Sequence, residues 1–180
     1  MSPGSPQLAD LHAPNADAPY LLRAEEGESL WFLDNLVTLK ATGAVTDGGL
    51  TVAHFVNPPG FAPPLHRHLR EVEMFYILSG TVEFHCQGVV LTAGAHDFIT
   101  LPKQVPHTFL VGPDEPLHAL QLTTPAGFED FAAAVGSPAL EHRLPDPGPL
   151  DPAALGHAAA LHHIEILGPP PHPAGPAPSA

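Results

Sequence analysis

The sequence of 180 residues has little positive charge, with 6 lysine and arginine residues against 19 aspartate and glutamate residues. The resulting net charge of −13 argues against nucleic acid and anionic membranes as partners, because both attract clustered basic side chains. Cys86 is the single cysteine, so no internal disulfide can form, which suits a reducing compartment. Neither a membrane-spanning apolar run nor a signal-peptide pattern is present. We therefore expect a cytoplasmic protein.

Proline is abundant, and its distribution suggests how the chain is organised. Of the 24 prolines, 11 lie between residues 137 and 180. Such a density is incompatible with the continuation of a sheet. We predict a flexible N-terminal arm over residues 1–19, a β-barrel domain over residues 20–136, and a Pro/Ala-rich C-terminal extension over residues 137–180. The extension is expected to contain a short helix and to end in a disordered tail.

Short apolar runs follow one another from Ser29 onward, each ending at a glycine or a proline. Runs of this length and spacing are typical of strands in a sandwich or barrel. Several alternate with a period of two, as expected when one face of a strand is buried. The runs are "SLWFLDNLVTLKATG", "LTVAHFVNPPG", "EMFYILSG", "TVEFHCQG", "VVLTAG", "DFITLP", "HTFLVG" and "LHALQLTTP".

Two short helices are predicted after these runs. In "GFEDFAAAVG" the apolar residues have helical spacing, and Gly136 is a plausible C-cap. In "DPAALGHAAALHH" Asp151 is suited to the N-cap and Pro152 to the first helical position. The following "IEIL" is expected to form one more strand.

The stretch "PPLHRHLREVEMFYILSG" places two histidines and two glutamates close together in a chain with few charged residues. His66 and His68 are two residues apart, so on a strand both imidazoles point to the same face. Two imidazoles and a carboxylate form a good partial shell for a divalent transition metal. Either Glu71 or Glu73 could supply the carboxylate. Position favours Glu73, because Glu71 falls in the expected turn. For the same reason we expect replacement of Glu71 by glutamine to change metal content and activity little.

A fourth ligand must come from a strand that returns to the same opening. His107 begins such a strand in "PKQVPHTFLVG". Phe75 and Phe109 each follow a candidate ligand by two residues and are expected to point into the same cavity. They would serve either as core residues or as contacts for a flat aromatic substrate.

These residues resemble the first motif of the cupins, in which a glycine, His-x-His, a glutamate and a second glycine follow at fixed spacing. Gly60, His66, His68, Glu73 and Gly80 meet every spacing, which selects Glu73 over Glu71. The second cupin motif is only partly kept. Pro102 and His107 are in register, whereas His96 and Gln104 replace glycines and Val111 replaces an asparagine. The resemblance implies an all-β cupin jelly-roll barrel, here followed by short C-terminal helices and a Pro-rich tail.

Within this group the chain looks similar to bacterial single-domain quercetin 2,3-dioxygenase-like proteins. That resemblance rests on "SLWFLDNLVTLKATG", "PAGFEDF" and "IEILGPP". It implies one divalent metal ion per chain (Fe, Mn, Co or Ni, with Zn possible), cleavage of a flavonol or related enolisable aromatic with O₂, and Glu73 acting as general base as well as ligand. Barrel cupins also pair through sheet edges, so we expect a homodimer. The metal ligands implied are His66, His68, Glu73 and His107.

Two other classes of function remain compatible with the sequence. A cupin with the same ligands could act as an isomerase, polyketide cyclase or dehydratase without consuming oxygen. A barrel lacking an open metal position could instead bind a small molecule without catalysis. Oxygen uptake distinguishes a dioxygenase from the non-oxidative enzyme. A purified protein that is folded but free of metal would favour the non-catalytic barrel.

Overall fold

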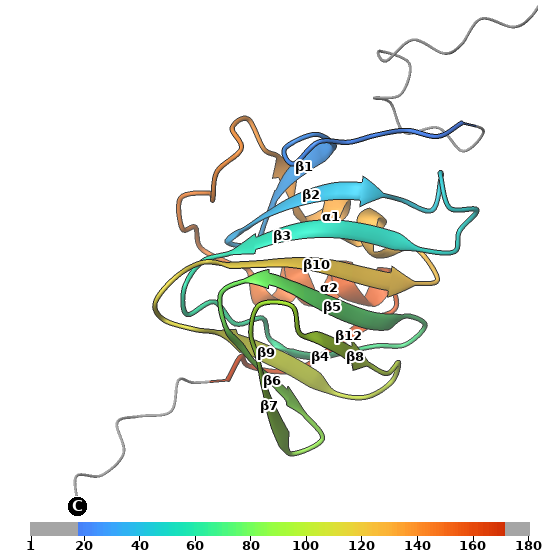
Figure 1. The fold of residues 1–180 in the computed structure, drawn as a ribbon. Coiled ribbons are helices and arrows are strands. Elements are labelled where there is room, and N and C mark those ends of the chain that lie inside the picture. Colours follow the sequence, from blue (N-terminus) through green and yellow to red (C-terminus); the bar gives the residue numbers. More distant parts are fainter. Residues whose placement is uncertain (1–17, 172–180) are drawn as a thin grey trace, which may run out of the picture.

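The computed structural model describes residues 18–171, which form two antiparallel sheets and two helices (Figure 1). The sheets face one another as a jelly-roll barrel, as the sequence predicted. The larger sheet has the strand order β11-β1-β2-β3-β10-β5-β8, and the smaller has the order β12-β4-β9-β6-β7. The predicted flexible arm lies almost wholly, and the end of the predicted disordered tail entirely, outside the described residues.

Nine strands coincide with the eight predicted apolar runs, because the first run contains two strands. Leu33 and Asp34 form the turn between those two, and Leu33 has a positive φ of 55°. The strand expected at His66 and His68 and the one expected at "IEIL" are also present, whereas the short strand Ser137–Pro138 was not predicted. The larger sheet comprises Glu28–Phe32 (β1), Asn35–Ala41 (β2), Thr51–Asn57 (β3), Val72–Ser79 (β5), Phe98–Leu101 (β8), Leu117–Thr124 (β10) and Ser137–Pro138 (β11). The smaller sheet comprises Leu65–His68 (β4), Val82–Cys86 (β6), Val89–Ala93 (β7), His107–Val111 (β9) and Ile164–Gly168 (β12).

Both predicted helices are present with the predicted ends. Helix α1 spans Phe128–Val135 and ends at Gly136, whose N–H donates to the Ala132 carbonyl. Helix α2 spans Pro152–Leu161, and the carboxylate of Asp151 accepts from the backbone N–H of Ala153 and Ala154. Among residues 18–171, neither helix has the length and apolar character needed to cross a membrane.

Two turns keep their shape although residues with side chains replace the glycines of the cupin motif. His96 has a φ of 73° and Gln104 a φ of 66°, both in the left-handed region that glycine favours. The N–H of Gln104 donates to the carbonyl oxygen of His68 over 2.7 Å. The turn after β8 is thereby attached to the strand that carries two of the candidate ligands.

The segment after α1 completes the barrel. Strand β12 pairs with β4, placing Ile164 opposite His68 and Ile166 opposite His66. Leu155 and Ala159 of α2 are buried. The division of the chain at residue 136 remains a prediction, but the structure shows that Ile164–Gly168 pairs with the strand that carries two of the histidines, and that α2 packs against β12.

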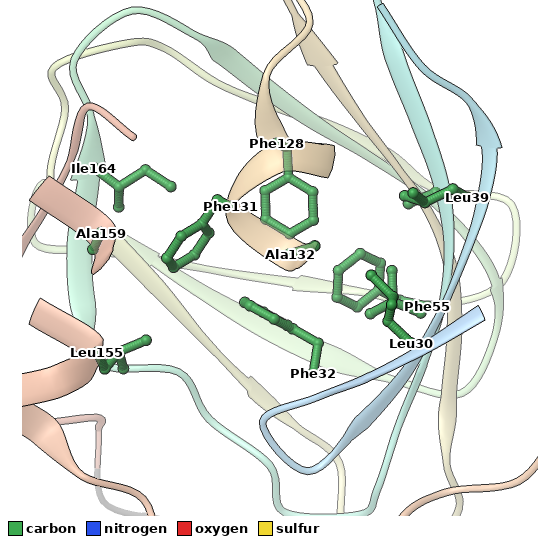
Figure 2. Close-up of a cluster of buried hydrophobic side chains, with 12 residues drawn as sticks. Leu30, Phe32, Leu39, Phe55, Phe128, Phe131, Ala132, Leu155, Ala159 and Ile164 are labelled. Carbon is green, nitrogen blue, oxygen red and sulfur yellow. The ribbon is translucent and has the colours of Figure 1, made fainter. Parts of the chain in front are cut away.

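Two buried apolar clusters fill the interior. The first, which we call the strand cluster, contains only barrel residues: Phe75, Ile77, Val82, Phe84, Leu101, Phe109, Val111, Leu117 and Ala119. The second, which we call the helix cluster, joins β1, β2 and β3 to both helices and β12 (Figure 2). Its members are Leu30, Phe32, Val37, Leu39, Ala53, Phe55, Phe128, Phe131, Ala132, Leu155, Ala159 and Ile164.

Candidate metal centre

The four candidate ligands come together between the two sheets. His66 and His68 lie on β4, and His107 lies on the adjacent strand β9, where it is the direct partner of His66. Glu73 reaches them from β5 of the opposite sheet. One ligand atom from each of these four side chains lies within 4.8 Å of the others. The cluster is therefore able to hold one metal ion.

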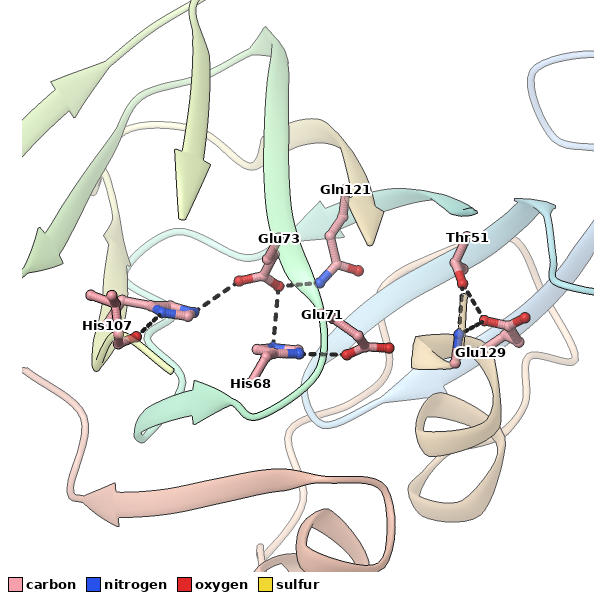
Figure 3. A network of polar contacts seen from close by, with 9 residues as sticks. Thr51, His68, Glu71, Glu73, His107, Gln121 and Glu129 are labelled. Carbon is pink, nitrogen blue, oxygen red and sulfur yellow. Dashed lines mark hydrogen bonds and ion pairs between the residues drawn. The ribbon is translucent and has the colours of Figure 1, made fainter. Parts of the chain in front are cut away.

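The three imidazoles are oriented by hydrogen bonds at Nδ1. His66 Nδ1 lies 2.9 Å from the Pro64 carbonyl oxygen, and His107 Nδ1 lies 2.8 Å from the Val105 carbonyl oxygen. His68 Nδ1 lies 2.6 Å from the Glu71 carboxylate (Figure 3). Because these oxygens only accept, each Nδ1 carries the proton, and a neutral ring then has an unshared electron pair at Nε2.

Electron-pair donors consequently face one another inside the cluster. His107 Nε2 lies 3.0 Å from Glu73 Oε2, and His68 Nε2 lies 3.8 Å from Glu73 Oε1. Each of these three residues is at most 3% exposed. A buried carboxylate directed at unprotonated nitrogens requires a cation between them, either a proton or a metal ion. Three nitrogens and a carboxylate are a donor set that fits a divalent transition metal.

Burial and neighbouring charges shift the pKa values of the cluster residues in opposite directions. Burial lowers the pKa of His66 to about 4, which keeps this imidazole neutral at pH 7. Burial also lowers the pKa of His68, but the charges of Glu73 and Glu71 outweigh it, so the pKa is raised overall. Burial raises the pKa of Glu73, yet His68 and His107 hold it well below its usual range. The site thus carries a buried negative charge that attracts a cation.

Glu71 plays a larger part than its turn position led us to expect. It does lie between β4 and β5, but it is only 7% exposed and accepts from His68 Nδ1. Space for its carboxylate depends on Gly127, since a Cβ there would approach Glu71 Oε1 to 3.0 Å. A carboxylate behind a ligating histidine fixes the ring and strengthens its basicity. The turn position of Glu71 was predicted, whereas its contact with His68 was not, and the effect of Glu71→Gln stays a prediction.

Gln121 was missed by the sequence analysis. It lies on β10, is 5% exposed, and donates from Nε2 to Glu73 Oε1 (Figure 3). One signal was present in the sequence. Gln121 occupies an inward-facing position of the alternating run "LHALQLTT", where a large polar side chain needs a buried partner.

A cavity connects the cluster with both apolar clusters. It has an empty volume of about 580 Å³, counting its open mouth, and its exposed lining is nearly all apolar. Phe75 and Phe109 line it, so both point toward the cavity as predicted. Their role as substrate contacts remains a prediction. The cavity continues to Phe32, Phe128 and Phe131 of the helix cluster.

Comparison with known proteins finds similarity to one family over part of the chain. Residues 53–123, which include all four candidate ligands, match the Cupin domain family. The chain is 29% identical over 164 residues to quercetin 2,3-dioxygenase of Bacillus subtilis, an alignment that covers 91% of the chain and 47% of that relative. The chain therefore spans about half the length of the curated relative it matches.

Solved structures share the cupin fold at lower identity. An RmlC-like cupin from Shewanella frigidimarina superposes with a TM-score of 0.54 at 18% identity, covering 63% of this chain and 96% of that one. Streptomyces PAC13, solved with uridine, superposes with a TM-score of 0.52 at 20% identity, covering 72% and 94%. Likenesses at this level of identity concern the fold alone.

Proposed function

We propose that this protein is a metal-dependent dioxygenase that cleaves a flavonol or a related enolisable aromatic with O₂. The observation that carries the proposal is a cluster of three histidines and a glutamate, of which His66, His68 and Glu73 line an aromatic-lined cavity. The similarity to a quercetin 2,3-dioxygenase over 91% of the chain supports this reaction over other cupin chemistries.

His66, His68, His107 and Glu73 would hold one divalent ion, which we propose to be Fe, Mn, Co or Ni, with Zn also accommodated. Imidazole and carboxylate ligands accept all of these metals. The bound ion would lower the pKa of a phenol or enol oxygen beside it, which would offset the weak basicity of Glu73. The histidine rings contribute orientation, because each Nδ1 is already fixed by an acceptor.

Glu73 is the residue that would accept the substrate proton. Its carboxylate is ionised, buried and placed on the cavity wall. Gln121 donates to Oε1, and His107 lies against Oε2, so the carboxylate has a defined orientation. A base held in this way is directed at whatever oxygen the substrate places beside the cluster.

The apolar part of the cavity would bind the rings of the substrate. Phe75 and Phe109 would contact the ring that carries the reacting oxygen, since both line the cavity with the ligand side chains. Aromatic side chains pack against flat substrates in offset or edge-to-face arrangements. Their apolar surroundings would exclude water from the reacting carbon atoms.

An oxygen electrode tests the proposal. The metal-loaded protein should consume O₂ in proportion to the flavonol lost, and the combined His66→Ala and His68→Ala variant should consume none. Protein with one bound metal per chain that consumes no O₂ with flavonols or other enolisable aromatics would contradict the dioxygenase. That result would favour a non-oxidative isomerase, cyclase or dehydratase.

A further inference from the structure

Two polar side chains line the cavity away from the metal cluster. Asn35 on β2 and Asn57 on β3 are each only 1% exposed, and both lie on the cavity wall. Neither takes part in metal binding or in the proton transfer proposed above, and we call them the asparagine pair. The other polar residues of the wall belong to the metal cluster or contact it: His66, His68, Glu73 and Gln121.

Aromatic side chains separate the asparagine pair from the metal cluster. Gln121, which contacts the cluster from β10, is the direct partner of Ala53 on β3. Asn57 lies further along β3, about 13 Å from Ala53 at 3.3 Å per residue. Phe55 occupies the inward position between them and lines the cavity, with its ring centroid 5.8 Å from that of Phe128 (Figure 2). A ligand that reaches both polar groups must therefore carry a ring system between two polar ends.

Hydrogen bonds fix the orientation of both amides in the asparagine pair. Asn35 Nδ2 donates to the Phe32 carbonyl oxygen over 3.1 Å. Because a carbonyl oxygen only accepts, the amide nitrogen of Asn35 must lie on that side and its Oδ1 on the other. This Oδ1 accepts from Asn57 Nδ2 over 2.8 Å. Asn57 thus presents its nitrogen to Asn35, and its own Oδ1 is directed away from the pair.

The side-chain oxygen of Asn57 has no protein partner. Among residues 18–171, no hydrogen bond reaches Asn57 Oδ1. The fully enclosed side-chain atoms without a partner in this part of the chain are His85 Nε2 and Thr123 Oγ1, so Asn57 Oδ1 is open to the cavity that the residue lines. The contact with Asn35 needs the amide N–H of Asn57 but not this oxygen. An apolar ligand that displaces water from such an acceptor loses free energy unless it also supplies a donor.

We propose that Asn57 Oδ1 binds a hydroxyl group of the substrate that is remote from the reacting oxygen. This role rests on the proposed function, which assigns the enolisable end of the substrate to the metal cluster. The substrate class is then narrowed to flavonols, or related enolisable aromatics, with a free hydroxyl on the ring farthest from the cluster. A hydroxyl can donate to the amide oxygen, whereas the oxygen of a methyl ether only accepts and would be repelled. Phe32 and Phe55 would pack against the intervening rings.

Anaerobic titration of the metal-loaded full chain tests the proposal, because binding is then measured without turnover. Three flavonols are compared that differ only on the ring remote from the enol, where they carry a hydroxyl, a methyl ether or hydrogen. Fluorescence quenching gives the dissociation constant of each. The wild type should bind the hydroxylated flavonol at least roughly 5-fold more tightly than either analogue, since the analogues leave a buried acceptor unpaired.

Asn57→Leu removes the acceptor while nearly keeping the size of the side chain, so it should bind the three flavonols with similar affinity. Phe55→Leu is the matched control, because it changes the packing on the same strand and leaves Asn57 in place. The control should bind all three flavonols more weakly and keep the wild-type preference. Asn57→Ser is a second variant in case Asn57→Leu fails to fold. Its hydroxyl can still donate to Asn35 Oδ1 but is too short to replace the amide oxygen, so the preference should be lost there too.

The possible results distinguish the role of Asn57 from the proposed function. Equal affinities of the wild type for the three flavonols would overturn the role of Asn57 and leave the dioxygenase untouched. A preference that persists in the Asn57 variants would overturn it as well, because another group would then bind the hydroxyl. So would loss of the preference in Phe55→Leu, since packing would then decide. If none of the three flavonols binds the metal-loaded wild type, both the role of Asn57 and the flavonol substrate are contradicted.

Discussion

The strand cluster and the helix cluster both border the cavity, but they are assembled from different parts of the chain. The strand cluster comes from five strands between residues 72 and 124. The helix cluster joins β1, β2 and β3 to α1, α2 and β12, so it links residue 30 to residue 164. The first is local and periodic, whereas the second depends on a segment more than a hundred residues away.

This difference indicates that the two clusters support different parts of the candidate metal centre. The strand cluster positions Glu73 and His107, which lie on β5 and β9 two residues before the cluster members Phe75 and Phe109. The helix cluster and β12 close the other side of the cavity and pair with the strand that carries His66 and His68. Substrate binding should therefore depend on the helix-cluster residues that line the cavity, as well as on Phe75 and Phe109, but not on strand-cluster residues such as Phe84 that lie away from it.

The largest effect is expected from truncating one phenylalanine in each cluster. Phe84→Ala and Phe131→Ala should each lower the free energy of unfolding by about 3–5 kcal/mol, because both side chains are buried. Only Phe131 lines the cavity, so only Phe131→Ala should also raise KM. Urea denaturation and steady-state kinetics measure the two effects. An equal rise in KM for Phe84→Ala would contradict the claim that substrate binding depends on the residues that line the cavity.

Glu73→Gln is expected to have the second-largest effect. Glutamine cannot accept a proton at neutral pH, and loss of a general base typically lowers the rate roughly 10²–10⁴-fold. We expect the variant to retain much of its metal and to lose at least about 10² in turnover. Metal analysis and oxygen uptake on the same preparation check this, with Glu165→Gln, at a partly exposed glutamate outside the cluster, as control. Unchanged turnover in metal-loaded Glu73→Gln would exclude the proton-transfer role.

Glu71→Ala should weaken metal binding without changing the ligands themselves. Removal of a carboxylate that holds a ligating histidine costs roughly 10–100-fold in metal affinity. Glu71→Gln keeps an oxygen that can accept from His68 Nδ1 and should lose less. Titration against a competing chelator measures both dissociation constants. Wild-type affinity in Glu71→Ala would show that His68 needs no support from the turn.

The smallest effect is expected from the ion pair that connects β4 to β12. Arg67 Nη2 lies 2.7 Å from Glu165 Oε2, but the two side chains are 36% and 45% exposed. Arg67→Ala should cost no more than about 1 kcal/mol of stability, and less at high salt. Ile164→Ala, on the buried side of the same strand, should cost about 2–4 kcal/mol. Equal losses in thermal or urea unfolding would mean that the ion pair, not packing, attaches β12.

The sequence predicted most of the fold and the ligand set because both depend on local spacing. Alternation identified the strands, and the interval between His66 and Glu73 matched a known motif. The residues that contact the ligands were harder to predict from the sequence. Glu71 and Gln121 reach the cluster from a turn and from β10, and neither contact follows from spacing along the chain. The covering role of α2 likewise depends on tertiary packing rather than on sequence pattern.

The most direct test of the account is the metal content of two purified proteins. After exposure to excess divalent metal and removal of the unbound ions, the wild type should retain one ion per chain. The combined His66→Ala and His68→Ala variant should retain none while keeping the circular dichroism spectrum of a folded β-protein. Stoichiometric metal in the folded double variant would contradict the central claim, because the ion would then be bound elsewhere than at these four side chains.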